Sequence, residues 1–204
     1  MTLKSTFVSD VEKERCLAVL LDKYYHKHLR NYNFTRIRGL KNQLKGVDLI
    51  LTNKFSGKKY FVDEKAQLDY TNEELPTFAF ELRYFKNSIV KKGWLFDSKK
   101  KTDFYSLITA IYSDEPNKFT SCKITFVNRL KLIQFLKTRN ISEKILEKRI
   151  NQQKNKVPKI HLKQLHPREE GYLYFSEKNK AEKPVNLILK LNFLISQGLA
   201  KRFV

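Results

Sequence analysis

The sequence is poor in the residues and motifs that build the common metal and cofactor sites. Its two cysteines, Cys16 and Cys122, cannot form a disulfide framework and lack metal-ligand spacing, so we expect both to be buried and reduced. The four histidines are too scattered for a zinc cluster. The sequence motifs of phosphate loops, dinucleotide-binding turns, zinc proteases and serine hydrolases are all absent, which leaves those classes without local support.

Long hydrophobic runs are also absent. No apolar run approaches the roughly 18 residues of a membrane span, and the N-terminus lacks the pattern of a signal peptide. Together with the reduced cysteines, these absences predict a cytoplasmic protein without a membrane partner.

Acidic residues are scarce relative to basic ones. Only 21 Asp and Glu stand against 41 Lys and Arg, which gives a net charge of +20 and a pI near 9.9. An excess of this kind favours polyanions, because lysine and arginine contact phosphates and release their counterions. The sequence therefore predicts a nucleic-acid partner, although charge does not separate DNA from RNA. The alternative is a structural protein whose lysines only confer solubility.

The pattern of apolar residues predicts an α/β protein with one ordinary domain and a small appendage. We expect helices over residues 9–29, 77–86, 128–138, 142–153 and 184–198, and strands over residues 34–37, 93–97, 103–112, 121–127 and 171–176. A polar break at residues 152–157 is the best candidate boundary. It divides the chain into an α/β core over residues 1–153 and a C-terminal extension of helix and strand over residues 154–204. We expect the extension to pack on the core and to serve substrate recognition or dimerisation.

The stretch with the clearest chemistry is a predicted antiparallel hairpin. Two runs with strand character, residues 47–52 and 59–66, flank a short polar loop that contains a glycine. With the turn centred in this loop, Asp48 lies directly opposite Asp63, and Lys65 lies on the same face because strand side chains alternate. Opposed residues have Cβ atoms roughly 4.5–5.5 Å apart, and like charges at that spacing repel. A divalent cation between the two carboxylates would remove the repulsion, because hard cations take oxygen ligands.

This pattern resembles the PD-(D/E)xK signature of the restriction-endonuclease-like nucleases. The signature places an aspartate near the start of one strand and an acid, one residue and a lysine on the next, which here are Asp48 and then Asp63, Glu64 and Lys65. Val47 stands where the signature has proline. The resemblance implies a mixed central sheet flanked by helices, and a Mg²⁺ or Mn²⁺ ion held by Asp48 and Asp63. It also implies a restriction- or repair-type endonuclease that hydrolyses DNA, and a homodimer, since many such nucleases act as two-fold dimers.

Glu64 is an alternate acid for this site. The family usually has an apolar residue at its position, and a slip of one residue in the hairpin would bring Glu64 opposite Asp48. We prefer Asp63, because only that choice keeps the acid and Lys65 on one face. Gln67 continues the same face by alternation, and a Gln or Glu just past the lysine is often a site residue in these nucleases.

Other residues are secondary candidates. Glu12 and Glu14 lie in the first turn of the first predicted helix, where the helix dipole favours acids, and a first-helix acid sometimes joins the site in the resembling nucleases. Glu81 borders the apolar stripe of the predicted helix over residues 77–86, either as an ordinary helix carboxylate or as support for the metal or the lysine. The predicted phosphate contacts are basic residues of two loops, namely Arg36, Arg38, Lys99, Lys100 and Lys101.

Two functions of different classes follow from these residues. The first is a metal-dependent endonuclease in which Asp48 and Asp63 hold Mg²⁺, while Lys65 positions or helps to deprotonate a water and stabilises the charge that develops on the phosphate. The second is a non-catalytic, basic nucleic-acid-binding protein on a nuclease fold that has lost its chemistry. Its binding would be sensitive to salt and indifferent to Mg²⁺.

Overall fold

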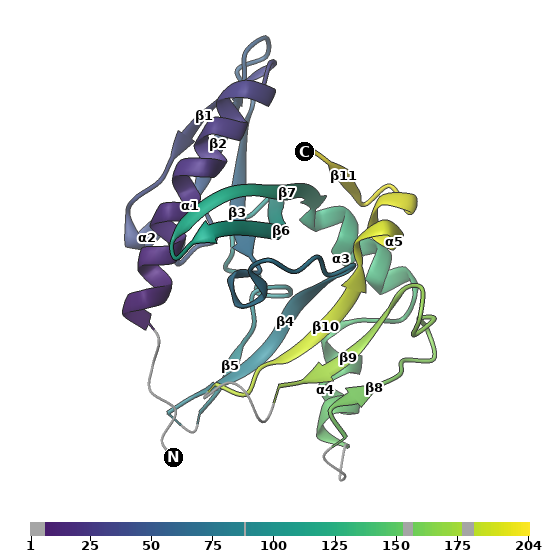
Figure 1. Ribbon diagram of the computed structural model, residues 1–204. Coiled ribbons are helices and arrows are strands. Elements are labelled where there is room, and N and C mark those ends of the chain that lie inside the picture. The colour runs from purple at the N-terminus through teal and green to yellow at the C-terminus, as the bar shows by residue number, and fades with distance from the viewer. Residues whose placement is uncertain (1–6, 88, 153–156, 177–181) are drawn as a thin grey trace. The chain divides into compact units, whose positions relative to one another are not determined.

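The computed structural model describes residues 7–87, 89–152, 157–176 and 182–204 (Figure 1). These residues form two compact units, each with its own β-sheet. The N-terminal unit contains Thr2–Leu75, Lys99–Asn128 and Ala200–Val204, and the inserted unit contains Pro76–Ser98 and Arg129–Leu199. The chain is thus an α/β protein with a mixed sheet and flanking helices, as the sequence predicts.

The N-terminal unit is built on a six-stranded mixed sheet with the strand order β1-β2-β3-β6-β7-β11. Strands β3 and β6 pair in parallel, and every other pair in this sheet is antiparallel. Strand β6 is buried along most of its length between β3 and β7, which confirms the central position expected from its apolar sequence. The strands are β1 (Tyr32–Arg36), β2 (Leu49–Asn53), β3 (Lys59–Ala66), β6 (Phe104–Glu115), β7 (Lys118–Asn128) and β11 (Ala200–Arg202).

Helix α1 (Phe7–His28) covers one face of this sheet and closes its hydrophobic core (Figure 1). It was expected from the 3.6-residue spacing of its apolar side chains. Cys122 belongs to the same core, as expected, whereas Cys16 on α1 is only partly buried. Two short elements, α2 (Leu40–Gln43) and the 3₁₀ turn η1 (Leu68–Tyr70), complete the unit. The core residues that join helix and sheet include Leu17, Leu21, Tyr25, Leu49, Val62 and Ile108.

The inserted unit is built on a five-stranded antiparallel sheet with the strand order β5-β4-β10-β9-β8. Three helices accompany it, and two of them, α3 and α4, match the helices predicted for this part of the chain. Helix α4 begins as expected after Ser142, whose hydroxyl oxygen accepts a hydrogen bond from the backbone N–H of Ile145 at 3.4 Å. The elements are β4 (Thr77–Lys86), β5 (Ile89–Lys92), β8 (Lys159–Ile160), β9 (Gly171–Phe175), β10 (Val185–Lys190), α3 (Arg129–Thr138), α4 (Glu143–Asn151) and α5 (Leu191–Ser196).

The helix predicted over residues 77–86 is wrong, because this segment forms strand β4. Aromatic side chains lie on both faces of the strand, and their positions happen to recur at three- and four-residue spacing. The burial of Phe78 and Phe80, two residues apart, shows the true period of two. A segment rich in phenylalanine and tyrosine also favours strand over helix. The strand expected over residues 93–97 is wrong too, since these residues follow β5 without forming one.

The helix predicted over residues 184–198 is correct only in its second half. The first half forms β10, which lies between β4 and β9 and is buried at five of its six positions. A strand buried on both faces has no polar positions to reveal its period, so its sequence resembles that of a buried helix. The helix α5 that follows stops as predicted before Gly198, which has a φ of +66°.

The predicted division of the chain at residue 153 falls on residues 153–156, which lie outside the described residues. The segments before and after it, Arg129–Asn151 and residues 157–199, belong to the same inserted unit. In the described residues, the N-terminal unit is therefore interrupted in sequence by the inserted unit, and the two units do not follow one another along the chain. Across the described ranges, no helix is both long and apolar enough to cross a membrane.

Candidate active site

The β2–β3 hairpin has the register that the sequence predicts. Leu49 pairs with Val62 and Ile50 with Phe61, and this ladder ends one residue before Asp48. The negative charge of Asp63 acts on the Asp48 carboxyl, so the two side chains lie near each other. Asp48 lies just before β2, and its backbone N–H donates to the carbonyl of Val62 at 2.8 Å. One-residue slippage, which would have brought Glu64 opposite Asp48, therefore does not occur.

The turn of this hairpin is fixed by its own side chains. The side-chain oxygen of Asn53 accepts hydrogen bonds from the backbone N–H groups of Phe55 and Ser56 at 3.0 and 2.9 Å. Gly57 supplies the left-handed residue, with a φ of +66°. Because the residues of the turn fix its conformation, they also set which residues of the two strands pair. This pairing in turn places Asp48 near Asp63.

Burial and the charge of Asp63 strongly influence the ionisation of Asp48. Burial raises the pKa of the Asp48 carboxyl most, and the negative charge of Asp63 raises it further, to about 7. Lys65 and the backbone N–H of Glu64, which donates to Oδ2 of Asp48 at 2.8 Å, only partly offset these effects. Without a cation, the Asp48 carboxyl therefore keeps its proton to a higher pH than an exposed aspartate does.

Lys65 completes the cluster as the sequence predicts. Its Nζ forms an ion pair with Oδ1 of Asp63, and its side chain is 28% exposed. Asp48 is also partly exposed, whereas Asp63 is only 2% exposed. Solvent therefore reaches the cluster from the side of Asp48 and Lys65, while Asp63 forms its floor.

The loop around Gly46 covers the remaining side of Asp63. Gly46 has a φ of +71°, and a Cβ atom there would lie 3.1 Å from Oδ2 of Asp63 and 2.4 Å from Oγ1 of Thr102. The Thr102 hydroxyl donates to the carbonyl of Gly46 at 2.8 Å and holds the loop in place. Only glycine fits this close approach with this backbone conformation. Gly46 and Thr102 were not among the site residues predicted from the sequence, although a glycine two residues before Asp48 was a signal for the first.

Oδ2 of Asp63 is buried and has no hydrogen-bond partner among the described residues. A buried carboxylate oxygen without a donor is rare, because it has lost its water without compensation. A divalent cation would satisfy this oxygen and neutralise the two aspartates together. The donor set, two converging carboxylates with one unsatisfied oxygen, thus fits such an ion. No cluster of three or more His, Cys, Asp or Glu suited to a metal forms within the described part of the chain, so other ligands would be backbone or water.

The lysine-rich segment after the inserted strands lies against the same loop. Nζ of Lys100 donates to the carbonyl of Leu44 at 3.0 Å, and the backbone N–H of Lys101 donates to the carbonyl of Lys45 at 2.8 Å. Lys99 and Lys101 are exposed. The structure therefore brings these predicted phosphate contacts to the loop that covers Asp63, although they are distant from it in sequence.

No protein-family model, curated protein or solved structure matches this chain.

Glu64 lies on the opposite face of β3, where its role differs from that of an alternate acid. The Tyr25 hydroxyl donates to Oε1 of Glu64 at 2.8 Å, and the Arg36 guanidinium forms an ion pair with its carboxylate. Tyr25 Oη also lies 3.0 Å from the hydroxyl of Ser106. The partly buried carboxylate of Glu64 thus joins α1 and β1 to the strand that carries Asp63 and Lys65. Strand alternation alone predicts that Glu64 turns away from Asp63.

Arg36 is held in the same network and is not placed as a phosphate contact. Its Nε donates to Oδ1 of Asp22 at 2.9 Å, and its side chain is only 18% exposed. Its two acidic partners raise the pKa of the guanidinium above its ordinary value despite burial. Arg36 was expected to contact phosphate, but its guanidinium instead forms ion pairs within the protein, with Asp22 and Glu64. Arg38, the other arginine predicted to contact phosphate, is exposed in the loop that follows β1.

The other candidates lie on α1, on β4 and at the end of β3. Glu12 and Glu14 are exposed on α1, which packs on the Glu64 face of the sheet, and neither forms a metal-suited cluster with Asp48 and Asp63 among the described residues. Glu81 lies on β4 of the inserted unit, in a strand where a helix was expected. Gln67 follows directly on the end of β3, and its backbone N–H donates to the carbonyl of Ile108 at 3.0 Å.

Proposed function

We propose that the chain is a metal-dependent endonuclease that hydrolyses DNA phosphodiester bonds, of the restriction or repair type. The observation that carries this proposal is the convergence of Asp48 and Asp63 beside Lys65, with one buried Asp63 oxygen left without a donor in the described structure. The resemblance to the PD-(D/E)xK signature, with its restriction-endonuclease-like core, supports the same assignment. Asp48 and Asp63 would hold Mg²⁺ or Mn²⁺.

The bound ion would polarise the scissile phosphate and lower the pKa of an attacking water. The chain's own residues would do the rest of the work. Lys65 is anchored by Asp63 and is exposed enough to meet a phosphate oxygen, so its ammonium would position the attacking water and offset the negative charge of the transition state. Asp48 would bind the ion only in its ionised form. The positive charge of the ion would stabilise that form and so displace the proton that the raised pKa of Asp48 otherwise retains.

DNA is supported by charge and by the position of the lysines. The chain carries a net charge of +20. Lys99, Lys100 and Lys101 adjoin the loop that covers Asp63, where they can contact the phosphates that flank the scissile bond. Cleavage of both strands would require two such sites, which a two-fold homodimer would supply.

The test is digestion of a supercoiled plasmid with Mg²⁺ by the wild type, Asp63→Asn and Asp114→Asn. Asp114 is an exposed aspartate of β6 in the same unit, so its substitution changes the net charge equally. We expect Asp63→Asn to lower the cleavage rate by at least about 100-fold, and Asp114→Asn to cleave like the wild type. Equal cleavage by Asp63→Asn and the wild type would refute the proposal.

One observation favours the second function, a non-catalytic nucleic-acid-binding protein on a degenerate nuclease fold. Asp63 is only 2% exposed beneath the Gly46 loop, so the scissile phosphate cannot reach it unless the cluster is entered from Asp48. This function predicts DNA binding that weakens steeply with salt, is unchanged by Mg²⁺, and survives substitution of Asp48, Asp63 and Lys65. Filter binding with and without Mg²⁺ separates it from the nuclease.

A further inference from the structure

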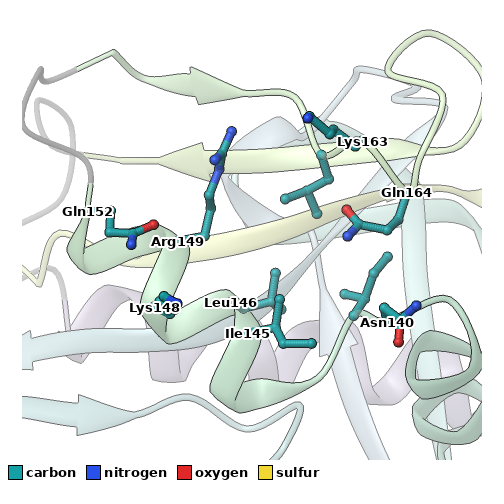
Figure 2. A pocket seen from close by; sticks show the side chains of 10 residues that line it. Asn140, Ile145, Leu146, Lys148, Arg149, Gln152, Lys163 and Gln164 are labelled. Carbon is teal, nitrogen blue, oxygen red and sulfur yellow. The ribbon is translucent and has the colours of Figure 1, made fainter.

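The inserted unit contains a cavity of about 200 Å³ that the proposed hydrolysis does not use. It lies beside α4, between the turn that precedes this helix and the loop that follows β8 (Figure 2). Helix α4 supplies Ile145, Leu146, Lys148 and Arg149 to its lining. All of the lining residues belong to this one unit.

The floor of the cavity is apolar. Ile141, Leu146 and Leu162 line it and are only 1%, 2% and 7% exposed, so their positions are fixed by the core beneath them. Ile145 stands at the edge and is 44% exposed. An apolar cavity of about 150 Å³ is large enough for benzene. The floor therefore has room for one flat ring.

The rim of the cavity is cationic. Lys148, Arg149 and Lys163 line it, and all three side chains are exposed. In Figure 2, Arg149 extends from α4 toward the level of the loop that carries Lys163. Counting only described residues, none of the three forms an ion pair and no carboxylate lines the cavity. These three cations can therefore bind an anion, and arginine and lysine are the side chains that commonly bind phosphate.

The acidic residues of α4 are directed to other partners. Glu143 forms an ion pair with Lys92 at 2.7 Å, and the negative charge of Glu147 acts on Arg83. The positive field of the rim is therefore not cancelled by its own helix. Because the acids of α4 interact with other residues, the positive charges of the rim remain available to an anion. Together with the apolar floor, they suit a ligand that has an anionic group and an apolar part.

Three amide side chains complete the rim: Asn140, Gln152 and Gln164. Each offers a hydrogen-bond donor and an acceptor, which is the pair of groups that binds the edge of a nucleobase. An apolar floor of ring size, amides at its edge and cations beside it match the three parts of one nucleotide.

We propose that this cavity binds a single nucleotide, with the base on the Ile141, Leu146 and Leu162 floor and the phosphate on Lys148, Arg149 and Lys163. The nucleotide is either free or an unpaired member of a nucleic-acid strand, since the same chemistry recognises both. The cavity and the proposed nuclease cluster belong to different units, and binding in the cavity requires neither metal nor hydrolysis.

The test is equilibrium binding by calorimetry to the full-length chain in EDTA, so that no cleavage occurs. The free-nucleotide probes are dAMP, deoxyribose 5-phosphate and inorganic phosphate, and the strand probe is a short single-stranded DNA that competes with dAMP. Burial of the base against the aliphatic floor should make dAMP bind at least about tenfold more tightly than deoxyribose 5-phosphate. Either tight binding of free dAMP alone, or its displacement by the strand, supports the proposal and identifies the source.

Two charge-matched triple variants locate the binding. The first is Lys148→Gln, Arg149→Gln and Lys163→Gln. The control replaces three exposed basic residues of the same unit that do not line the cavity, Lys91→Gln, Lys137→Gln and Arg168→Gln. We expect the first to lose at least about tenfold in dAMP affinity and the control to lose less than about twofold. Ile145→Glu, at an exposed edge that tolerates substitution, should also abolish binding while circular dichroism shows a folded protein.

Three results would overturn the proposal: no detectable binding of dAMP or the strand, equal affinity for dAMP and deoxyribose 5-phosphate, or equal losses in the two triple variants. Asp63→Asn distinguishes this site from the nuclease cluster. Asp63→Asn should slow plasmid cleavage strongly and leave the affinity for dAMP unchanged. The cavity triple variant should keep plasmid cleavage and lose affinity for dAMP.

Discussion

Without a cation, the protein should lose stability as the pH rises from about 4 to about 7, and Asp48→Asn should remove that loss. The pKa of the Asp48 carboxyl rises from 3.8 to about 7 in the folded chain, first through burial and then through the charge of Asp63. Between these two values the unfolded chain has lost the proton and the folded chain still holds it. Because the unfolded state then binds fewer protons, the free energy of unfolding falls with rising pH. Above about 7 both states are ionised and the curve is flat.

The size of the loss follows from the shift. One pKa unit corresponds to about 1.4 kcal/mol, so a shift of about three units corresponds to about 4 kcal/mol. Relaxation around the charged pair reduces this, and we expect a loss of about 2–4 kcal/mol. In Asp48→Asn the side-chain oxygen can still accept the hydrogen bond from the N–H of Glu64, while no charge forms at any pH. The variant should therefore match the wild type near pH 4 and exceed its stability by about 2–4 kcal/mol at pH 8.

Urea denaturation in EDTA at pH 4 to 8 measures this difference. Asp114→Asn, which replaces an exposed aspartate, should keep the pH dependence of the wild type. Addition of Mg²⁺ at pH 8 should restore stability to the wild type, by about 2.7 kcal/mol at one hundred times the dissociation constant, and leave Asp48→Asn unchanged. A variant with the same pH dependence as the wild type, or one less stable at pH 8, would refute the reasoning.

Two further substitutions examine the surroundings of the cluster, and urea denaturation reports both. Gly46→Ala should destabilise more than Gly57→Ala, because both glycines have positive φ, at +71° and +66°, yet only Gly46 has neighbours within 4 Å of the added Cβ. The strain common to both costs about 1–2 kcal/mol, and equal effects would show that the loop yields freely. Arg36→Ala should cost about 3 kcal/mol by leaving the buried carboxylate of Glu64 without its cation, whereas exposed Arg38→Ala should change stability by less than about 0.5 kcal/mol. If Arg36→Ala destabilises the protein no more than Arg38→Ala, the ion pair between Arg36 and Glu64 does not contribute to stability as we expect.

The hairpin was predictable because its information is local. The turn residues after Asn53 and the alternation of the strands fix the register up to the pair of Leu49 and Val62, and Asp48 and Asp63 are the next residues beyond this pair. The same alternation sends Glu64 to the opposite face, where Tyr25 and Arg36 meet it. These features depend on neighbours within a few residues along the strands, which the sequence displays directly.

The second sheet was not predictable from periodicity. Strand β4 has aromatic residues on both faces and β10 is buried on both, so neither shows the polar alternation that identifies a half-exposed strand. Their pairing with each other joins Phe80 to Leu187, more than one hundred residues apart in the sequence. Only tertiary contacts decide between helix and strand for such segments.

The burial of Asp63 was also hidden in the sequence. It depends on Thr102, which comes from a distant segment and holds Gly46 over the carboxylate. The parallel pairing of β3 with β6, across the inserted strands, is what brings that segment to the hairpin. Short motifs show which residues can act together, while the cover that controls access to them comes from long-range topology.

The central claim is that Asp48 and Asp63 together hold a divalent cation. A crystal soaked in Mn²⁺ measures this directly, because the anomalous signal of manganese locates the ion without reference to activity. We expect one peak in contact with carboxylate oxygens of both aspartates, and its loss in Asp63→Asn. No peak at the hairpin at a Mn²⁺ concentration that supports cleavage, or a peak that persists in Asp63→Asn, would contradict the account.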